Sequence, residues 1–139
     1  MSFSSLQLHS SLLQAIAEAG YTEPTPIQQA AIPLVLTGQD VIGIAQTGTG
    51  KTAAFTLPIL TRLLESGVGT GIKVLVLAPT RELAVQIEDN VRAYAQHTKV
   101  TMATVFGGVG ERPQMAALRK GVDVVIACPG RLLDLMQQG

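Results

Sequence analysis

Three segments of the chain align with one another without gaps, and each has the pattern of a strand that is buried on both faces. They read GQDVIGIAQT from Gly38, GIKVLVLAPT from Gly71 and GVDVVIACPG from Gly121. Each contains a continuous apolar run, which is typical of parallel strands covered by helices on both sides. Buried parallel strands converge on similar sequences, so the shared pattern indicates an architecture and not a repeat.

Segments with helical periodicity lie before the first of these runs and between the runs. We expect a helix that Gly20 terminates, helices over 26–36, 51–64, 82–95 and 112–118, and a weaker strand near 100–106. Alternating strands and helices predict right-handed crossovers and therefore a doubly wound, mainly parallel α/β sheet. Because such sheets bind ligands beyond the carboxyl ends of their strands, the loops that start at Ala45, Ala78 and Cys128 are expected to gather at one edge.

The composition fits a domain with a real core and no strong electric field. Of the 139 residues, 47% are hydrophobic and only 14% are charged, and ten basic residues balance ten acidic ones. A polyanion would therefore have to be bound by local contacts. The single cysteine, Cys128, excludes an internal disulfide framework. With no signal-peptide pattern and no apolar stretch of about 18 residues, the sequence predicts a cytoplasmic protein without a membrane span.

The segment AQTGTGKT, which begins at Ala45, follows the first apolar run and is typical of a phosphate-binding loop. Gly48 and Gly50 allow backbone conformations that aim N–H groups inward. Lys51 can reach the β- and γ-phosphates, and Thr52 can offer its hydroxyl to Mg²⁺. The strict pattern has glycine where this chain has alanine. A glycine-rich turn between a strand and a helix, with an incidental lysine, is the alternative interpretation.

The segment GYTEPTPIQ, which begins at Gly20, precedes the first apolar run. Pro24 and Pro26 restrict the backbone and place Gln28 about one turn into the following helix. A glutamine amide presents a donor and an acceptor side by side, the pair that can read the N6 and N7 edge of adenine. The composition also fits a plain loop that enters a helix.

Together these segments resemble the first RecA-like lobe of a bacterial-type DEAD-box ATP-dependent RNA helicase. GYTEPTPIQ resembles that family's Q motif, with Phe3 as the isolated upstream aromatic residue, and AQTGTGKT resembles motif I, in which alanine is usual at the position of Ala45. APTRELA from Ala78 resembles motif Ia, the two glycines at 107–108 resemble the GG element, and CPGR from Cys128 resembles motif Ib. The five elements occur in the family's order across essentially the whole chain.

The resemblance implies a role for each matching residue. The implied contacts to ATP and its Mg²⁺ are made by Phe3, Tyr21, Gln28, Thr47, Gly48, Thr49, Gly50, Lys51 and Thr52. The implied contacts to the RNA backbone are made by Pro79, Thr80, Arg81, Gly107, Gly108, Pro129, Gly130 and Arg131. Lys51 and Thr52 are the members of the catalytic site that this chain contains, and Thr52 meets the metal through the nucleotide. Cys128 stands where the family usually has threonine, and its thiol is a weaker donor.

Other parts of the family's machinery are not visible in this sequence. Phosphoryl transfer also needs a second-strand carboxylate for Mg²⁺ and a residue that orients the attacking water. Asp40 and Asp123 stand at the start of their runs, and Asp134 stands in the last helical pattern. Because the DEAD and SAT elements and the second lobe are missing, we expect a truncated lobe that does not turn over ATP alone. Its exposed sheet edge is expected to pair with a second copy.

The resemblance therefore implies one incomplete helicase ATP-binding domain over residues 1–139, with a Q-motif segment 1–37 and a P-loop core 38–139. Its predicted function is the nucleotide- and RNA-backbone-binding part of an ATP-hydrolysing RNA helicase. A non-catalytic module that binds ATP and RNA is the alternative. A P-loop small-molecule kinase would need a substrate lid and a downstream carboxylate, and it leaves GYTEPTPIQ unexplained. His9 and His97 are expected to be surface residues without partners.

Overall fold

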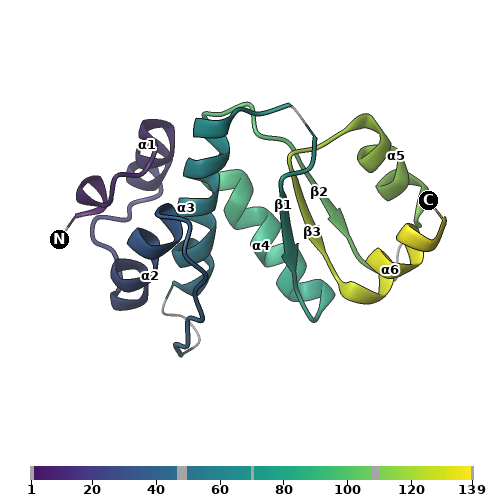
Figure 1. Cartoon of the computed structure of the whole chain (residues 1–139), viewed down its shortest axis with the longest axis horizontal. Coiled ribbons are helices and arrows are strands. Elements are labelled where there is room, and N and C mark those ends of the chain that lie inside the picture. The colour runs from purple at the N-terminus through teal and green to yellow at the C-terminus, as the bar shows by residue number, and fades with distance from the viewer. Residues whose placement is uncertain (1, 47–49, 70, 108–109, 139) are drawn as a thin grey trace. The chain divides into compact units, whose positions relative to one another are not determined.

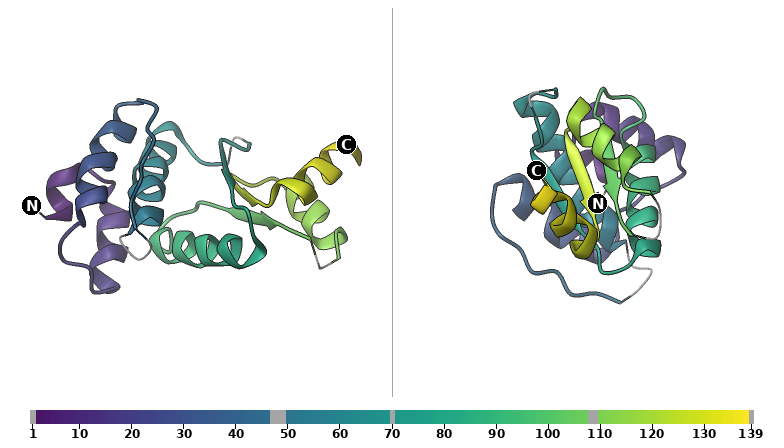
Figure 2. Two further views of the ribbon diagram at one scale, coloured as in Figure 1. Left: turned by 90° about the horizontal axis from the view of Figure 1, so that it is seen from below. Right: turned by 90° about the vertical axis from the view of Figure 1, so that its right-hand side faces the viewer.

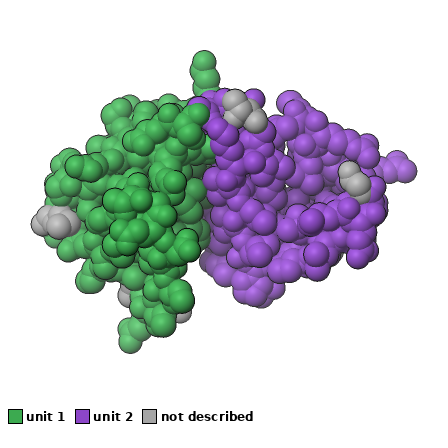
Figure 3. Space-filling view, in the orientation of Figure 1, with its two compact units in different colours: residues 1–66, 90–99 green, residues 67–89, 100–139 purple. Residues whose placement is uncertain are grey.

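The computed structural model describes residues 2–46, 50–69, 71–107 and 110–138. Its elements are a 3₁₀ turn η1 (Phe3–Leu6), the helices α1 (Ser10–Glu18), α2 (Pro26–Leu36), α3 (Lys51–Ser66), α4 (Arg81–Tyr94), α5 (Arg112–Lys120) and α6 (Pro129–Gln138), and the strands β1 (Val74–Leu77), β2 (Met102–Val105) and β3 (Val124–Ala127) (Figure 1). They form two compact units, residues 1–66 with 90–99 and residues 67–89 with 100–139 (Figure 3).

The predicted helices form close to their expected bounds. α2 spans Pro26–Leu36 as predicted, because Pro26 occupies a first helical position, where no backbone N–H is required. The helix over 51–64 continues two residues further, to Ser66. Among the helices that the described residues form, none has the length and apolar character that a membrane crossing needs.

The first unit is helical, and α2 and α3 lie side by side in it (Figures 1 and 2). Its largest fully buried side chains include Leu12, Ile32, Leu57, Leu60 and Val91. The backbone N–H of His9 donates to the buried hydroxyl of Thr61 at 3.1 Å, and this bond fixes the start of α1 to α3. The buried face of α1 consists of Leu12, Ala15 and Ile16.

The two histidines have partners, which corrects the expectation that they stand alone. The ring nitrogen Nδ1 of His9 lies 2.7 Å from the hydroxyl of Ser11, in the first turn of α1. His97 Nε2 lies 2.7 Å from Glu18 Oε2 at the end of α1, and Gln96 donates to the same oxygen at 3.2 Å. The hydrogen bond with His97 lowers the pKa of Glu18 despite some desolvation. These contacts join the end of α1 to the turn after α4.

The second unit contains a parallel sheet in the order β1-β3-β2. The chain crosses from β1 over the central strand to β2 through α4, and then returns to β3 through α5. Because right-handed crossovers in opposite directions place their helices on opposite faces, the sheet is doubly wound, as predicted. Contacts agree with this arrangement, since Thr104 of β2 bonds to Glu88 of α4, whereas its neighbours in sequence face the other way.

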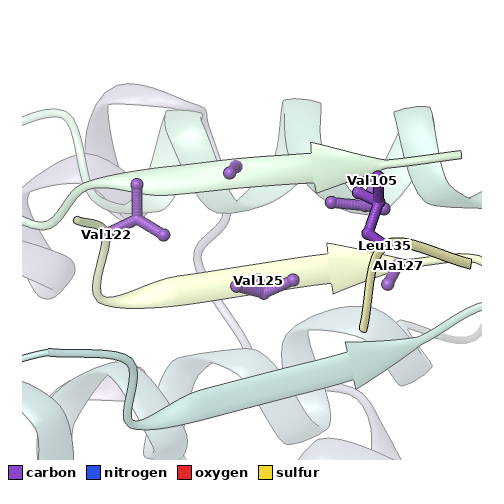
Figure 4. Close-up of a cluster of buried hydrophobic side chains, with 6 residues drawn as sticks. Val105, Val122, Val125, Ala127 and Leu135 are labelled. Atoms are coloured by element: carbon purple, nitrogen blue, oxygen red, sulfur yellow. The ribbon is translucent and has the colours of Figure 1, made fainter. Parts of the chain in front are cut away.

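Those neighbours belong to an apolar cluster on the opposite face of the sheet (Figure 4). Alternate residues of β2 and β3 meet Leu135 of α6 there, and Met115 and Leu118 of α5 pack against them. The buried members are Ala103, Val105, Val122, Val125, Ala127 and Leu135. This cluster holds α5 and α6 against the strands and so fixes the loops at the strand ends.

One of the predicted strands does not form. The segment that begins at Gly38 has no strand structure over residues 39–46, and its apolar side chains point outward, with Ile42 92% and Ile44 89% exposed. A strand is stable only when a neighbour pairs with its backbone, and the three-stranded sheet provides no such pairing for this segment. The segment is rich in apolar residues, as are the other two runs, but it does not form a strand in this structure.

Asp123 joins three segments at the amino-terminal edge of the sheet. Its carboxylate accepts from the backbone N–H groups of Gly69 at 2.7 Å and Thr101 at 3.0 Å, and from the Thr101 hydroxyl at 3.1 Å. The residue is 1% exposed. Burial opposes ionisation, but these hydrogen bonds and the charge of Lys73 outweigh it and lower the pKa of Asp123. The carboxylate is therefore a structural tie between the loop before β1, β2 and β3.

Candidate functional site

The start of α3 carries the charged part of the predicted phosphate site. Lys51 and Thr52 occupy the first two positions of this helix, with Lys51 exposed and Thr52 half-buried. A helix N-terminus offers free N–H groups and a partial positive charge, so this end suits an anion. Thr47, Gly48 and Thr49, which the sequence also assigns to the phosphates, lie outside the described residues.

Gln28 is in contact with this loop. Its Nε2 donates to the backbone carbonyl of Gly50 at 3.2 Å, and its Oε1 accepts from the backbone N–H of Thr25 at 2.9 Å. The side chain is 6% exposed. Gly50 has φ +85°, and a Cβ atom placed on it would lie 2.3 Å from Gln28 Nε2. The glycine is therefore required both for its backbone conformation and for the close approach of the glutamine.

A polar atom without a partner lies at the same place. Within the described part of the chain, the buried hydroxyl of Thr25 has no hydrogen-bond partner, and the Cβ position of Gly50 lies 3.3 Å from it. The Gln28 amide still has one N–H beyond the bond to Gly50. Together with Lys51 and Thr52, these groups fit a ligand with polar ring edges and phosphates.

The two aromatic residues of the predicted nucleotide site differ in exposure. Phe3 is buried in η1, which packs against α2, the helix that carries Gln28. Tyr21 is 55% exposed. Burial raises the pKa of Tyr94, and the nearby Tyr21 adds to the increase. Phe3 thus has the surroundings of a supporting core residue, whereas Tyr21 presents a free ring surface.

The second unit brings three predicted elements to one edge of the sheet. The last residues of the strands are aligned, because Leu77 of β1 and Val105 of β2 both pair with Ala127 of β3. The elements that begin at Pro79, Gly107 and Pro129 follow these ends directly. The expectation that the loops after Ala78 and Cys128 share an edge is therefore confirmed. Gly108 lies outside the described residues.

Helix starts and arginines provide the positive groups at this edge. Thr80 caps α4, since its hydroxyl accepts from the backbone N–H of Leu83 at 3.2 Å. The guanidinium of Arg81 lies 5.0 Å from the centre of the Phe106 ring, a cation–π contact. Pro129 begins α6, so a second helix N-terminus lies at the same edge. Such N–H groups and arginines suit phosphate oxygens.

Gln114 is a residue of this edge that the sequence did not indicate. It lies in α5 and is 8% exposed. Its Nε2 donates to the backbone carbonyl of Phe106 at 3.0 Å, and its Oε1 accepts from Arg131 Nη1 at 3.2 Å. A single glutamine in an amphipathic helix gives no local signal of such a role, because the two partners are distant in sequence.

Among the residues that the structure describes at these two places, carboxylates do not gather. Among the described residues, no group of three or more His, Cys, Asp or Glu side chains is arranged to hold a metal ion. Asp40 is exposed, and Asp134 lies 3.4 Å from Gln138 Nε2 on α6.

The chain is similar in sequence to known proteins. Residues 25–139 match the model of the family described as DEAD/DEAH box helicase. The chain is 50% identical over 133 residues to the DEAD-box ATP-dependent RNA helicase RhpA of Helicobacter pylori, with 96% of this chain and 26% of that protein covered. It is 48% identical over 129 residues to DEAD-box ATP-dependent RNA helicase 30 of Arabidopsis thaliana, covering 91% and 22%. The chain thus spans about a quarter of these relatives' length.

Solved structures show the same fold. A DEAD box protein from the hyperthermophile Methanococcus jannaschii superimposes with a TM-score of 0.91 at 37% identity, covering all of this chain and 38% of that one. A hypothetical ATP-dependent RNA helicase from Sulfolobus tokodaii gives a TM-score of 0.84 at 39% identity, covering 95% and 37%. The predicted RecA-like, doubly wound α/β class is therefore confirmed.

Proposed function

The chain belongs to the DEAD/DEAH box helicase family, and on that premise we propose that it is the nucleotide- and RNA-backbone-binding part of an ATP-dependent RNA helicase. The observation that carries this proposal is the bond from Gln28 to the carbonyl of Gly50. It joins the proposed adenine-reading residue to the proposed phosphate loop across 22 positions of sequence. A helix-capping role accounts for the bond that Gln28 accepts from the Thr25 backbone N–H, but not for the second bond, which its Nε2 donates to the loop.

In the proposed nucleotide site, each residue contacts one part of ATP. Gln28 reads the polar edge of adenine, and Tyr21 packs on the adenine ring. Phe3 supports α2, because η1 packs against that helix. The loop from Thr47 to Gly50 surrounds the phosphates, and Lys51 and Thr52 complete the site. Mg²⁺, which Thr52 would meet together with the phosphate oxygens, supplies neutralisation of phosphate charge. The chain's own contribution is to bind and orient the nucleotide.

In the proposed RNA site, the aligned strand ends supply contacts that do not depend on base sequence. Arg81 and Arg131 provide positive charge. Backbone groups come close to the RNA strand at Pro79, Thr80, Gly107, Gly108, Pro129 and Gly130. Contacts to phosphates fix the position of a nucleic acid without reading its bases. Local groups of this kind allow a chain with zero net charge to bind RNA.

We propose that residues 1–139 act as part of one lobe, with a Q-motif segment 1–37 and a P-loop core 38–139. A second RecA-like lobe would complete both the ATP site and the RNA site in the whole protein. Hydrolysis of ATP coupled to separation of RNA strands is the activity we propose for that protein. The alternative is a module that binds ATP and RNA without hydrolysis, and an RNA-stimulated ATPase assay of the whole protein separates the two.

A reducing compartment, and specifically the cytoplasm, suits the lone Cys128.

Arg81→Ala is expected to weaken binding of a fluorescent decauridylate about tenfold, because a charged hydrogen bond to phosphate is lost. The slope of log K against log[salt], measured by fluorescence anisotropy, should become shallower by about 0.7, the value for one contact to single-stranded nucleic acid. Arg119→Ala is the matched control, since this exposed arginine stands in the last turn of α5. Equal losses for both variants would contradict a specific site at the strand ends.

We also propose that the exposed side of β1 pairs with a second copy of this chain. Leu75 and Leu77 are 53% and 56% exposed although they share a sheet face with Val125 and Ala127. An uncovered apolar strand at a sheet edge favours association. The double variant Leu75→Lys, Leu77→Lys is expected to sediment as a monomer at concentrations where the wild type forms dimers. A wild type that stays monomeric at high concentration would contradict this proposal, and Leu133→Lys on α6 is the control.

A further inference from the structure

We infer that Gln114 is a positioning residue of the proposed RNA site, which holds Arg131 and the backbone of Phe106 in one arrangement. The inference rests on the proposed function, because it gives Arg131 its role toward RNA. It adds a residue of α5 to that site, although this helix carries none of the elements that the sequence assigns to RNA.

The two partners of Gln114 fix the orientation of its amide. The carbonyl of Phe106 can only accept and the guanidinium of Arg131 can only donate, so Nε2 must face Phe106 and Oε1 must face Arg131. The side chain is 8% exposed, so both bonds are largely shielded from water. A buried amide whose two ends are both used is costly to disturb, because each lost bond leaves a polar group without a partner.

The Gln114 amide connects the residue that precedes the second RNA element with a residue of the third. Phe106 immediately precedes Gly107, and its ring also carries the guanidinium of Arg81 at 5.0 Å. Arg131 stands in the first turn of α6. A chain of contacts therefore runs from Arg81 through Phe106 and Gln114 to Arg131. It joins the first and third RNA elements through Phe106, the residue before the second.

The consequence of these contacts is pre-organisation of the two arginines. A free arginine side chain loses considerable rotamer entropy when it binds a phosphate. Arg131, which Gln114 already holds, loses less, so its contact with RNA is stronger than that of an unrestrained arginine. A glutamine that only stabilised α5 would have no effect of this kind on the arginines.

Gln114→Met tests the role, because methionine keeps the approximate length and volume while removing both hydrogen bonds. Binding of fluorescent decauridylate by the chain is measured by anisotropy between low and moderate salt. We expect affinity to fall about fivefold to tenfold and the salt slope to become shallower by up to about 0.7, as Arg131 loses its fixed position. Met115→Ala is the control, since Met115 packs α5 against the apolar cluster without contacting Arg131.

A double-mutant cycle with Arg131→Ala separates positioning from stability. If Gln114 acts through Arg131, Gln114→Met adds less than about a twofold loss in the Arg131→Ala background. Independent, multiplied effects, or an equal loss in Met115→Ala, would overturn the inference. If Gln114→Met does not fold by circular dichroism, Gln114→Leu takes its place, because leucine also removes both hydrogen bonds, and the same loss of slope is expected. A wild type that binds no RNA would overturn the proposed function, and this inference with it.

Discussion

Replacement of Asp123 with alanine is expected to lower the free energy of unfolding by about 3 kcal/mol, because buried donors lose their acceptor. Gly69 and Thr101 together direct three hydrogen bonds at this carboxylate. All lie at the amino-terminal edge of the sheet, where β2 and β3 begin, so the loss weakens the pairing of both strands. Urea denaturation followed by circular dichroism at pH 7 measures the change.

The effect of Asp123 is also expected to depend on pH. Its pKa is lowered in the folded state, so its contribution is present above the unfolded-state value and is lost as the pH falls through the folded-state value. The stability difference between wild type and Asp123→Ala should be constant from about pH 7 to about pH 5 and shrink below about pH 4.

Asp40 provides a matched control for both measurements. It occupies the same position in the first apolar segment as Asp123 does in the third, but it is exposed. Asp40→Ala should change the free energy of unfolding by less than about 0.5 kcal/mol. If the two variants were equally stable, the three hydrogen bonds at Asp123 would have no role in holding the sheet together.

Gly50→Ala is expected to weaken binding of Mg·ATP at least about tenfold, equivalent to about 1.4 kcal/mol. The added methyl group would meet Gln28 Nε2 at 2.3 Å, so the glutamine must leave the carbonyl of Gly50. The residue also has φ +85°, a conformation that costs an alanine about 1–2 kcal/mol. Isothermal titration calorimetry measures the affinity, and denaturation measures the change in stability.

Gly67→Ala separates the effect of backbone strain from the effect of the collision with Gln28. Gly67 has φ +103°, and nothing lies within 4 Å of its Cβ position, so alanine there brings backbone strain without a collision. We expect this variant to lose stability but to keep its affinity for Mg·ATP. Equal affinity in Gly50→Ala and the wild type would show that the approach of Gln28 to the loop has no part in binding nucleotide.

The helices and the fold class could be predicted because they depend on local patterns. α2 begins at Pro26, a residue type that suits the first helical position, and strands of continuous apolar residues indicate a parallel sheet. The same apolar pattern wrongly predicted a strand for the segment that begins at Gly38. Its side chains are as apolar as those of the other two runs, but a run of this kind cannot show which neighbour will pair with it.

The sites were predicted to different extents for a similar reason. Gln28, Lys51 and Arg81 stand in compact segments whose spacing indicates a ligand. Gln114 does not, since its partners stand 8 and 17 positions away in sequence. His97 and Glu18 are 79 positions apart, and their contact likewise depends on packing alone.

Asp123 has a structural role that its position in the sequence does not indicate. Its place at the start of a strand excludes it from a metal site at the carboxyl edge, and that conclusion agrees with the structure. The same place lets it accept hydrogen bonds from two neighbouring segments. Its role becomes visible only when the positions of Gly69 and Thr101 are known.

The most direct test of the central claim is a comparison of Mg·ATP and Mg·GTP binding to the wild-type chain by isothermal titration calorimetry. The proposed site reads adenine through Gln28 beside a phosphate loop, so ATP should bind at least about tenfold more tightly than GTP, and Gln28→Ala should remove this preference. Equal affinity for the two nucleotides in the wild type, or a preference that survives in Gln28→Ala, would contradict the claim.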